Sequence, residues 1–80
     1  MPARQPSFSP KFSERLVQFG ATEGERNEIK FEVRRLVQAP ETGTPILFLA
    51  EKLFVHTVGR FSLYYTYSDD SLDVLTIELK

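Results

Sequence analysis

Apolar and polar residues alternate along residues 61–67, which predicts a β-strand with one buried face. One face would hold Phe61, Leu63, Tyr65 and Tyr67, and the other Ser62, Tyr64 and Thr66. Aromatic side chains suit a pleated, half-buried surface, so this composition supports a strand.

A second strand is expected over residues 72–79, after a turn rich in Asp and Ser at residues 68–71. Its apolar residues fall on both faces, with Leu72 and Val74 on one and Leu75, Ile77 and Leu79 on the other. Such a strand needs cover on both sides. Because an isolated hairpin is marginal in water, the rest of the chain must supply part of that cover.

Two helices are expected before these strands. The first begins at Ser9–Pro10, with Ser as the N-cap and Pro at the first helical position. Phe12, Leu16 and Phe19 form its apolar stripe, and Gly20 is expected to end it.

The second helix is expected to follow Thr22, which can form a capping box with Glu25. Its apolar face consists of Ile29, Val33, Leu36 and Val37, and Ala39–Pro40 ends it. Acidic residues come early and basic residues late, which complements the helix dipole. Phe31 lies off the apolar face, where it would either widen the buried surface, which we favour, or mark a contact surface.

The segment between the second helix and the first predicted strand is expected to be a loop at residues 41–45, followed by extended chain over residues 46–58. Glu51–Lys52 is a candidate interruption of that extended chain. Gly59–Arg60 then makes a tight turn into the strand that follows.

The fold expected from this order is a single α+β domain over residues 9–80. Two N-terminal helices, a helical hairpin, would pack on one face of a three- to four-stranded, mostly antiparallel, twisted sheet. Residues 1–8 contain Pro6, which removes a backbone donor, so they would form a flexible tail or a short edge strand around Ser7–Phe8.

Composition narrows the functional classes. The chain has 80 residues, no cysteine and a formal net charge of -1, with 10 Lys and Arg against 11 Asp and Glu. Disulfides, thiolate zinc sites and cysteine nucleophiles are therefore excluded, and a strongly basic nucleic-acid binder is not indicated. No apolar run approaches the roughly 20 residues that span a bilayer, and no signal-peptide core begins the chain. We therefore expect a cytoplasmic protein without membrane contact.

Residues 58–77 carry a recognisable pattern: a glycine, an aromatic residue, a Tyr-rich strand, an acidic turn and a closing aliphatic strand. They read Val-Gly-Arg-Phe-Ser-Leu-Tyr-Tyr-Thr-Tyr-Ser-Asp-Asp-Ser-Leu-Asp-Val-Leu-Thr-Ile, and Leu36-Val-Gln-Ala-Pro40 and Gly43-Thr-Pro45 precede them. In these segments and in its layout, the chain resembles the RelE/ParE superfamily of bacterial toxins from type II toxin–antitoxin systems. The resemblance implies that family's fold, an antitoxin partner and a role such as plasmid stabilisation.

The chain departs from the ribonuclease members of this family at their basic positions. The strand after the glycine begins with a functional Arg in those relatives, and this sequence has Ser62 there. The basic positions of the preceding strand correspond to Val55 and Thr57. Ribonucleolysis without a metal needs an acid, a base and a cation that stabilises the phosphorane charge.

The candidates for that chemistry are His56, Arg60 and Tyr64, and each also has an ordinary structural role. His56 has an intrinsic pKa suited to acid–base work but fits equally as a polar strand residue. Arg60 could bind a phosphate or a partner carboxylate, or it could be a turn charge. Tyr64 could stack on a base or enter an interface, or it could pack across the sheet. No metal or other cofactor is expected.

Partner binding is a second candidate role for the polar and apolar surface. Arg26, Lys30 and Arg34 follow one another at i, i+4 and i+8, so they form one basic stripe on the second helix, either solvated or in contact with a partner. The full set of candidate partner-binding residues is Arg26, Lys30, Arg34, Arg60, Tyr64, Leu75 and Ile77. The chain also has more apolar area than an 80-residue core easily absorbs, from Phe8, Phe48, Phe54, Leu75, Ile77 and Leu79. A homodimer or an antitoxin complex would each cover that excess.

The function that this sequence favours is that of a toxin that acts by binding a protein, as the ParE branch acts on DNA gyrase, and is neutralised by an antitoxin. The missing basic positions and the slight net acidity favour this hypothesis over catalysis. The alternatives are a ribosome-dependent messenger-RNA endoribonuclease of the RelE type, and a non-toxic binding or regulatory module on the same fold.

Overall fold

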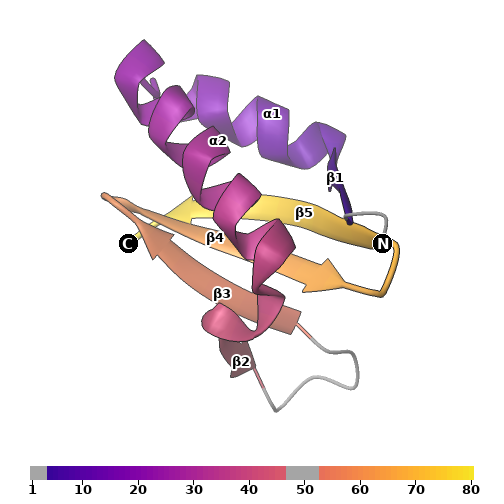
Figure 1. The fold of residues 1–80 in the computed structure, drawn as a ribbon. Coiled ribbons are helices and arrows are strands. Elements are labelled where there is room, and N and C mark those ends of the chain that lie inside the picture. Colours follow the sequence, from indigo (N-terminus) through magenta and orange to yellow (C-terminus); the bar gives the residue numbers. More distant parts are fainter. Residues whose placement is uncertain (1–3, 47–52) are drawn as a thin grey trace.

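A computed structural model describes residues 4–46 and 53–80 of the chain. In chain order the elements are β1 (Gln5–Phe8), α1 (Pro10–Gln18), α2 (Glu23–Gln38), the 3₁₀ turn η1 (Pro40–Thr42), β2 (Thr44–Ile46), β3 (Leu53–Val58), β4 (Phe61–Tyr67) and β5 (Ser71–Leu79). Both helices lie over the same face of the sheet, which makes a two-layer α+β domain (Figure 1).

The helix boundaries follow the capping signals of the sequence. The Ser9 hydroxyl accepts a hydrogen bond from the Phe12 amide at 3.2 Å, and Pro10 is the first helical residue of α1. Thr22 and Glu25 form the predicted reciprocal capping box of α2. The Glu25 amide donates to the Thr22 hydroxyl at 3.1 Å, and the Thr22 amide donates to the Glu25 carboxylate at 2.9 Å. Gly20, just beyond α1, has a φ of +63°, which glycine adopts without strain. Both helices are confirmed.

The sheet has five strands in the order β1-β5-β4-β3-β2, so the expected three to four strands were too few. β2, β3, β4 and β5 pair antiparallel, and β1 pairs parallel with β5 from Gln5↔Ser71 to Phe8↔Val74. The N-terminal segment is therefore an edge strand from residue 5 to residue 8. β2 was missed because Gly43 and Pro45 indicate a loop, and an edge strand of three residues tolerates that proline.

A β-bulge in β5 overturns the expected placement of Ile77. Tyr64 pairs with Thr76 but Tyr65 pairs with Val74, so Leu75 has no partner in β4. The extra residue moves every later side chain to the opposite face. Ile77 consequently lies in the core with no exposed surface, whereas Leu75 is 37 % exposed.

The core lies between the helices and the covered face of the sheet. It consists of Phe12, Ile29, Val33, Leu36, Val37, Phe54, Val58, Phe61, Leu63, Tyr65, Leu72, Val74 and Ile77. The predicted apolar face of residues 61–67 is thus confirmed, with Tyr67 partly buried at its end. The expected burial of Phe31 was wrong, because its side chain is 61 % exposed. Phe31 follows Ile29 by two residues, about 200° around the helix, and so points away from the sheet.

A buried tyrosine fixes the connection between α2 and β2. The Tyr65 hydroxyl donates a hydrogen bond to the carbonyl of Pro40 and accepts one from the Gly43 amide at 3.1 Å. A Cβ on Gly43 would lie 3.0 Å from two ring carbons of Tyr65 and closer still to its hydroxyl. Position 43 therefore requires glycine, because the Tyr65 ring leaves no space for a side chain there.

The structure leaves one sequence prediction untested and bears on another only within the described residues. The candidate interruption at Glu51–Lys52 falls outside the described residues. Among the residues that are described, no helix combines the length and apolar character that crossing a membrane requires.

Candidate functional site

An open groove of about 250 Å³ lies between β1, α1 and α2. It is lined by Phe8 of β1, by Phe12, Ser13 and Leu16 of α1, and by Arg26, Ile29 and Lys30 of α2. Helical spacing puts these side chains together, because residues three or four apart share one face of a helix. The groove thus has an apolar floor and a basic rim.

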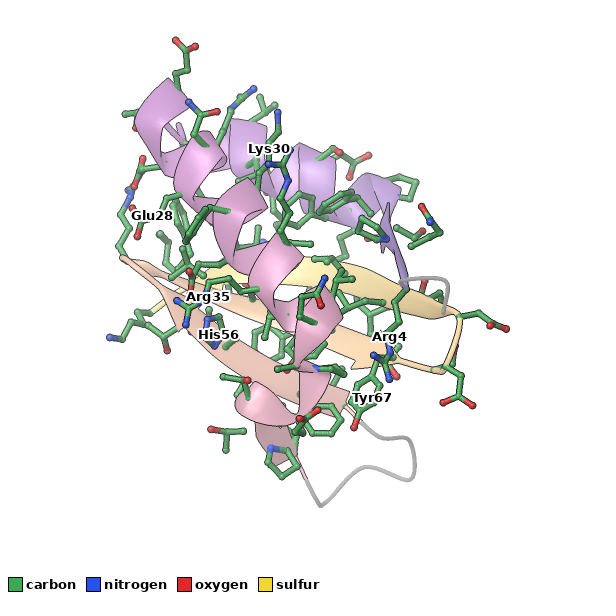
Figure 2. The ribbon with its side chains drawn as sticks, in the orientation of Figure 1. Arg4, Glu28, Lys30, Arg35, His56 and Tyr67 are labelled. Atoms are coloured by element: carbon green, nitrogen blue, oxygen red, sulfur yellow. The ribbon has the colours of Figure 1, made fainter. Side chains whose placement is uncertain are left out.

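The basic rim is made by Arg26 and Lys30, two members of the predicted basic stripe. Lys30 projects from α2 on the side that faces α1 (Figure 2). Neither cation takes part in an ion pair among residues 4–46 and 53–80, in contrast to Arg15, Arg35 and Arg60. The third member of the stripe, Arg34, is exposed and does not line the groove. The structure therefore joins two of the three predicted cations to an apolar cavity.

His56 lies under α2 and is engaged by a carboxylate. Its Nε2 is 3.0 Å from Oε1 of Glu32, and Oε2 of the same carboxylate is 3.3 Å from Arg35 Nη1 (Figure 2). The hydrogen bond with His56 is the main cause that lowers the pKa of Glu32, although burial opposes it. Thr42 and Leu36 complete the lining of a cavity of about 60 Å³. This volume admits a water or two but no nucleotide.

Glu32 was not among the residues predicted from the sequence, although helical spacing contains a signal for it. Glu32 follows Ile29 by three residues and precedes Leu36 by four, so it lies beside the buried stripe of α2. His56 lies between Phe54 and Val58 at period two, which places it on the face that α2 covers. The pairing itself requires the relative position of the helix and the strand.

Arg60 connects the β3–β4 turn to both helices. Its Nε and Nη2 are 2.7 Å and 3.1 Å from the two carboxylate oxygens of Glu25, and Nη2 also donates to the Phe19 carbonyl at 3.1 Å. The hydrogen bond with Arg60 lowers the pKa of Glu25 to about 2. The guanidinium is thus occupied by contacts within the chain. This arrangement corresponds to a structural turn charge rather than to a ligand for a phosphate or a partner carboxylate.

Tyr64 lies on the open face of the sheet, opposite the helices. Val55 pairs with Tyr64 across β3 and β4, and Thr57 pairs with Ser62. Leu75 is exposed at the bulge in β5, whereas Ile77 is in the core and cannot belong to a surface. Among the described residues of β1 to β5, the charged ones on this face are Asp73 and Glu78. Glu78 is paired with Arg15 of α1 at 3.1 Å, and Lys80 follows directly after the end of β5.

In the described part of the chain, no three His, Asp or Glu side chains converge as metal ligands would. Tyr64 and Leu75 share the open sheet face, Arg26 and Lys30 share the groove, and His56 and Arg60 are each paired with a glutamate of α2.

No protein-family model matches this chain, and no curated protein matches it.

Proposed function

We propose that this chain is a RelE/ParE-like toxin that acts by binding a protein and is neutralised by an antitoxin, both in the cytoplasm. The two helices over one sheet face would correspond to that family's helical hairpin, and β3, β4 and β5 to its antiparallel run. The support comes from the resemblance of residues 58–77 and from an α+β fold of compatible layout. DNA gyrase, the target of the ParE branch, is the first target to test.

The observation that carries the non-ribonucleolytic form of this proposal is the composition of the open sheet face. Val55, Thr57 and Ser62 stand where the ribonuclease relatives carry basic residues, and the strand register puts all three on this face. A phosphate-binding surface needs cations. The described residues of β1 to β5 contribute none to this face, and the Arg15 guanidinium of α1, which reaches Glu78 there at 3.1 Å, is held by that carboxylate. Stabilisation of a phosphorane charge would therefore need a cation from outside these strands.

The state of His56 supports the same conclusion. A general acid or base must reach the proton that it transfers. His56 lies on the helix side of the sheet, its side chain is 20 % exposed, and its Nε2 is taken by Glu32. An RNA chain on the open face would therefore be separated from this imidazole by the sheet.

Controlled expression in a bacterial host tests the proposal, with growth, DNA damage and messenger-RNA cleavage recorded after induction. We expect growth arrest without messenger-RNA cleavage, accompanied by gyrase-dependent DNA damage. Co-expression of a gene adjacent to this one in its genome should relieve the arrest. His56→Ala should remain as toxic as the parent if it still folds.

Two results would replace this proposal. Messenger RNA cut in translating ribosomes, with loss of cutting in His56→Ala, would establish the endoribonuclease alternative. Growth that is unaffected at verified expression of folded protein would favour the non-toxic binding or regulatory module.

A further inference from the structure

The groove between β1, α1 and α2 has the features of a binding site for part of a protein. Its floor contains Phe12 and Ile29, both in the core, and Phe8 forms a wall although 42 % of it is exposed. The rings of Phe8 and Phe12 lie 5.0 Å apart, so the wall is a continuous aromatic surface. Exposed aromatic surface beside a cavity is typical of a contact site.

The volume of the groove limits what it can hold. Sites for drug-sized ligands usually enclose about 300–1,000 Å³, and this open groove measures about 250 Å³. It therefore suits one large apolar side chain better than a whole cofactor. Such an anchor, supplied by a longer segment that lies across the opening, is the usual centre of a protein interface.

The charges around the groove indicate the character of that segment. Arg26 and Lys30 lie one helical turn apart on the rim, and the lining contains no carboxylate. Ser13 is the remaining polar side chain of the lining. Two cations without ion pairs among the described residues favour carboxylates on the partner, because complementary charge steers association and fixes register.

We propose that this groove binds an acidic, amphipathic segment of a partner protein, with one Leu, Phe or Trp side chain in the cavity and flanking carboxylates on Arg26 and Lys30. The proposal rests on the proposed function only in that the chain works by binding a protein. Its test measures binding to the purified chain, so its failure is distinguishable from a failure to arrest growth.

The experiment is selection of a random peptide library displayed on phage against the folded full chain, followed by titration of the recovered peptides. We expect a consensus with one large apolar residue and Asp or Glu three or four positions away. Lys30→Glu and Arg26→Glu should each weaken binding about tenfold or more. Arg34→Glu, on the same stripe but outside the groove, is the matched control and should change affinity less than threefold.

A second pair of variants tests occupancy of the cavity. Ser13→Trp should fill the groove and abolish peptide binding, whereas Glu14→Trp, on the next position of α1 and outside the lining, should not. Both positions are exposed, so both variants should fold, which circular dichroism and thermal unfolding will check.

Several outcomes would overturn the inference. They are a library that yields no binders, a consensus without acidic residues, equal effects of Lys30→Glu and Arg34→Glu, and peptides that still bind Ser13→Trp. Chemical-shift changes that map to the open sheet face would also contradict it.

Discussion

Replacing Tyr65 with Phe should destabilise the protein strongly, although it removes a single oxygen atom. The hydroxyl donates to the Pro40 carbonyl and accepts from the Gly43 amide, and both of those residues are buried. Burial raises the pKa of Tyr65 above its ordinary value of 10.0, so the hydroxyl remains a donor at neutral pH. Phenylalanine would leave a buried amide and a buried carbonyl without partners.

The expected loss follows from the cost of those two groups. An unsatisfied buried donor or acceptor costs about 1–3 kcal/mol, and relaxation of η1 toward water would recover part of it. We therefore expect Tyr65→Phe to lower the free energy of unfolding by about 2–3 kcal/mol. A chain of this size has roughly 4–12 kcal/mol in total, so the change should be plain in a urea titration.

Tyr67→Phe is the matched control for this prediction. Tyr67 is the next residue on the same face of β4, it is partly buried, and no hydrogen bond of its hydroxyl is found among the described residues. Its replacement should change the free energy of unfolding by less than about 0.5 kcal/mol. If Tyr65→Phe and Tyr67→Phe shift the urea midpoint equally, the assigned role of the Tyr65 hydroxyl is wrong.

Three further predictions test other parts of the fold. The pKa of Glu25 is lowered to about 2, so its contribution to stability should be complete above pH 4.5 and should be lost as the pH falls toward 2. The urea midpoints of the parent and of Glu25→Gln should therefore converge in acid. A Cβ at Gly24, within α2, would have only Thr22 Oγ1 near it, at 3.9 Å, so Gly24→Ala should stabilise the protein by about 0.5–1 kcal/mol. Gly43→Ala should destabilise it, because the new Cβ meets the Tyr65 ring. Unfolding temperatures that shift in the same direction for both variants would contradict this. Ile77→Ala should cost about 2–5 kcal/mol and Leu75→Ala less than about 1, and the reverse order in denaturant titrations would refute the bulge.

The parts of the fold that were predictable from sequence are those that local patterns determine. The caps at Ser9 and Thr22 and the alternation of residues 61–67 are each encoded within a few neighbouring residues, and each prediction is confirmed. The bulge at Leu75 is different, because Leu75 and Ile77 continue the same apolar alternation whether or not a residue is skipped. The register is set by the partner strand, which a local pattern does not contain.

The candidate site was predictable to a smaller extent for the same reason. The basic stripe was visible in the sequence, but its meeting with Phe8 and Leu16 depends on how β1 and α1 lie against α2. The partners of His56 and Arg60 come from residues 24 and 35 positions away in the chain. Charge type alone could not indicate which acid would pair with which base.

The charges of α2 are divided between two sides of the helix, and this division links the fold to the proposed binding mode. Glu25 and Glu32 are seven residues apart, close to two full turns, so they lie on one side and hold Arg60 and His56 of the β3–β4 region. Glu28 also points toward the turn between β3 and β4 (Figure 2). Arg26 and Lys30 lie on the side of the groove. Because Glu25 and Glu32 are paired with Arg60 and His56 on the other side of α2, they leave the basic rim available to carboxylates from another molecule.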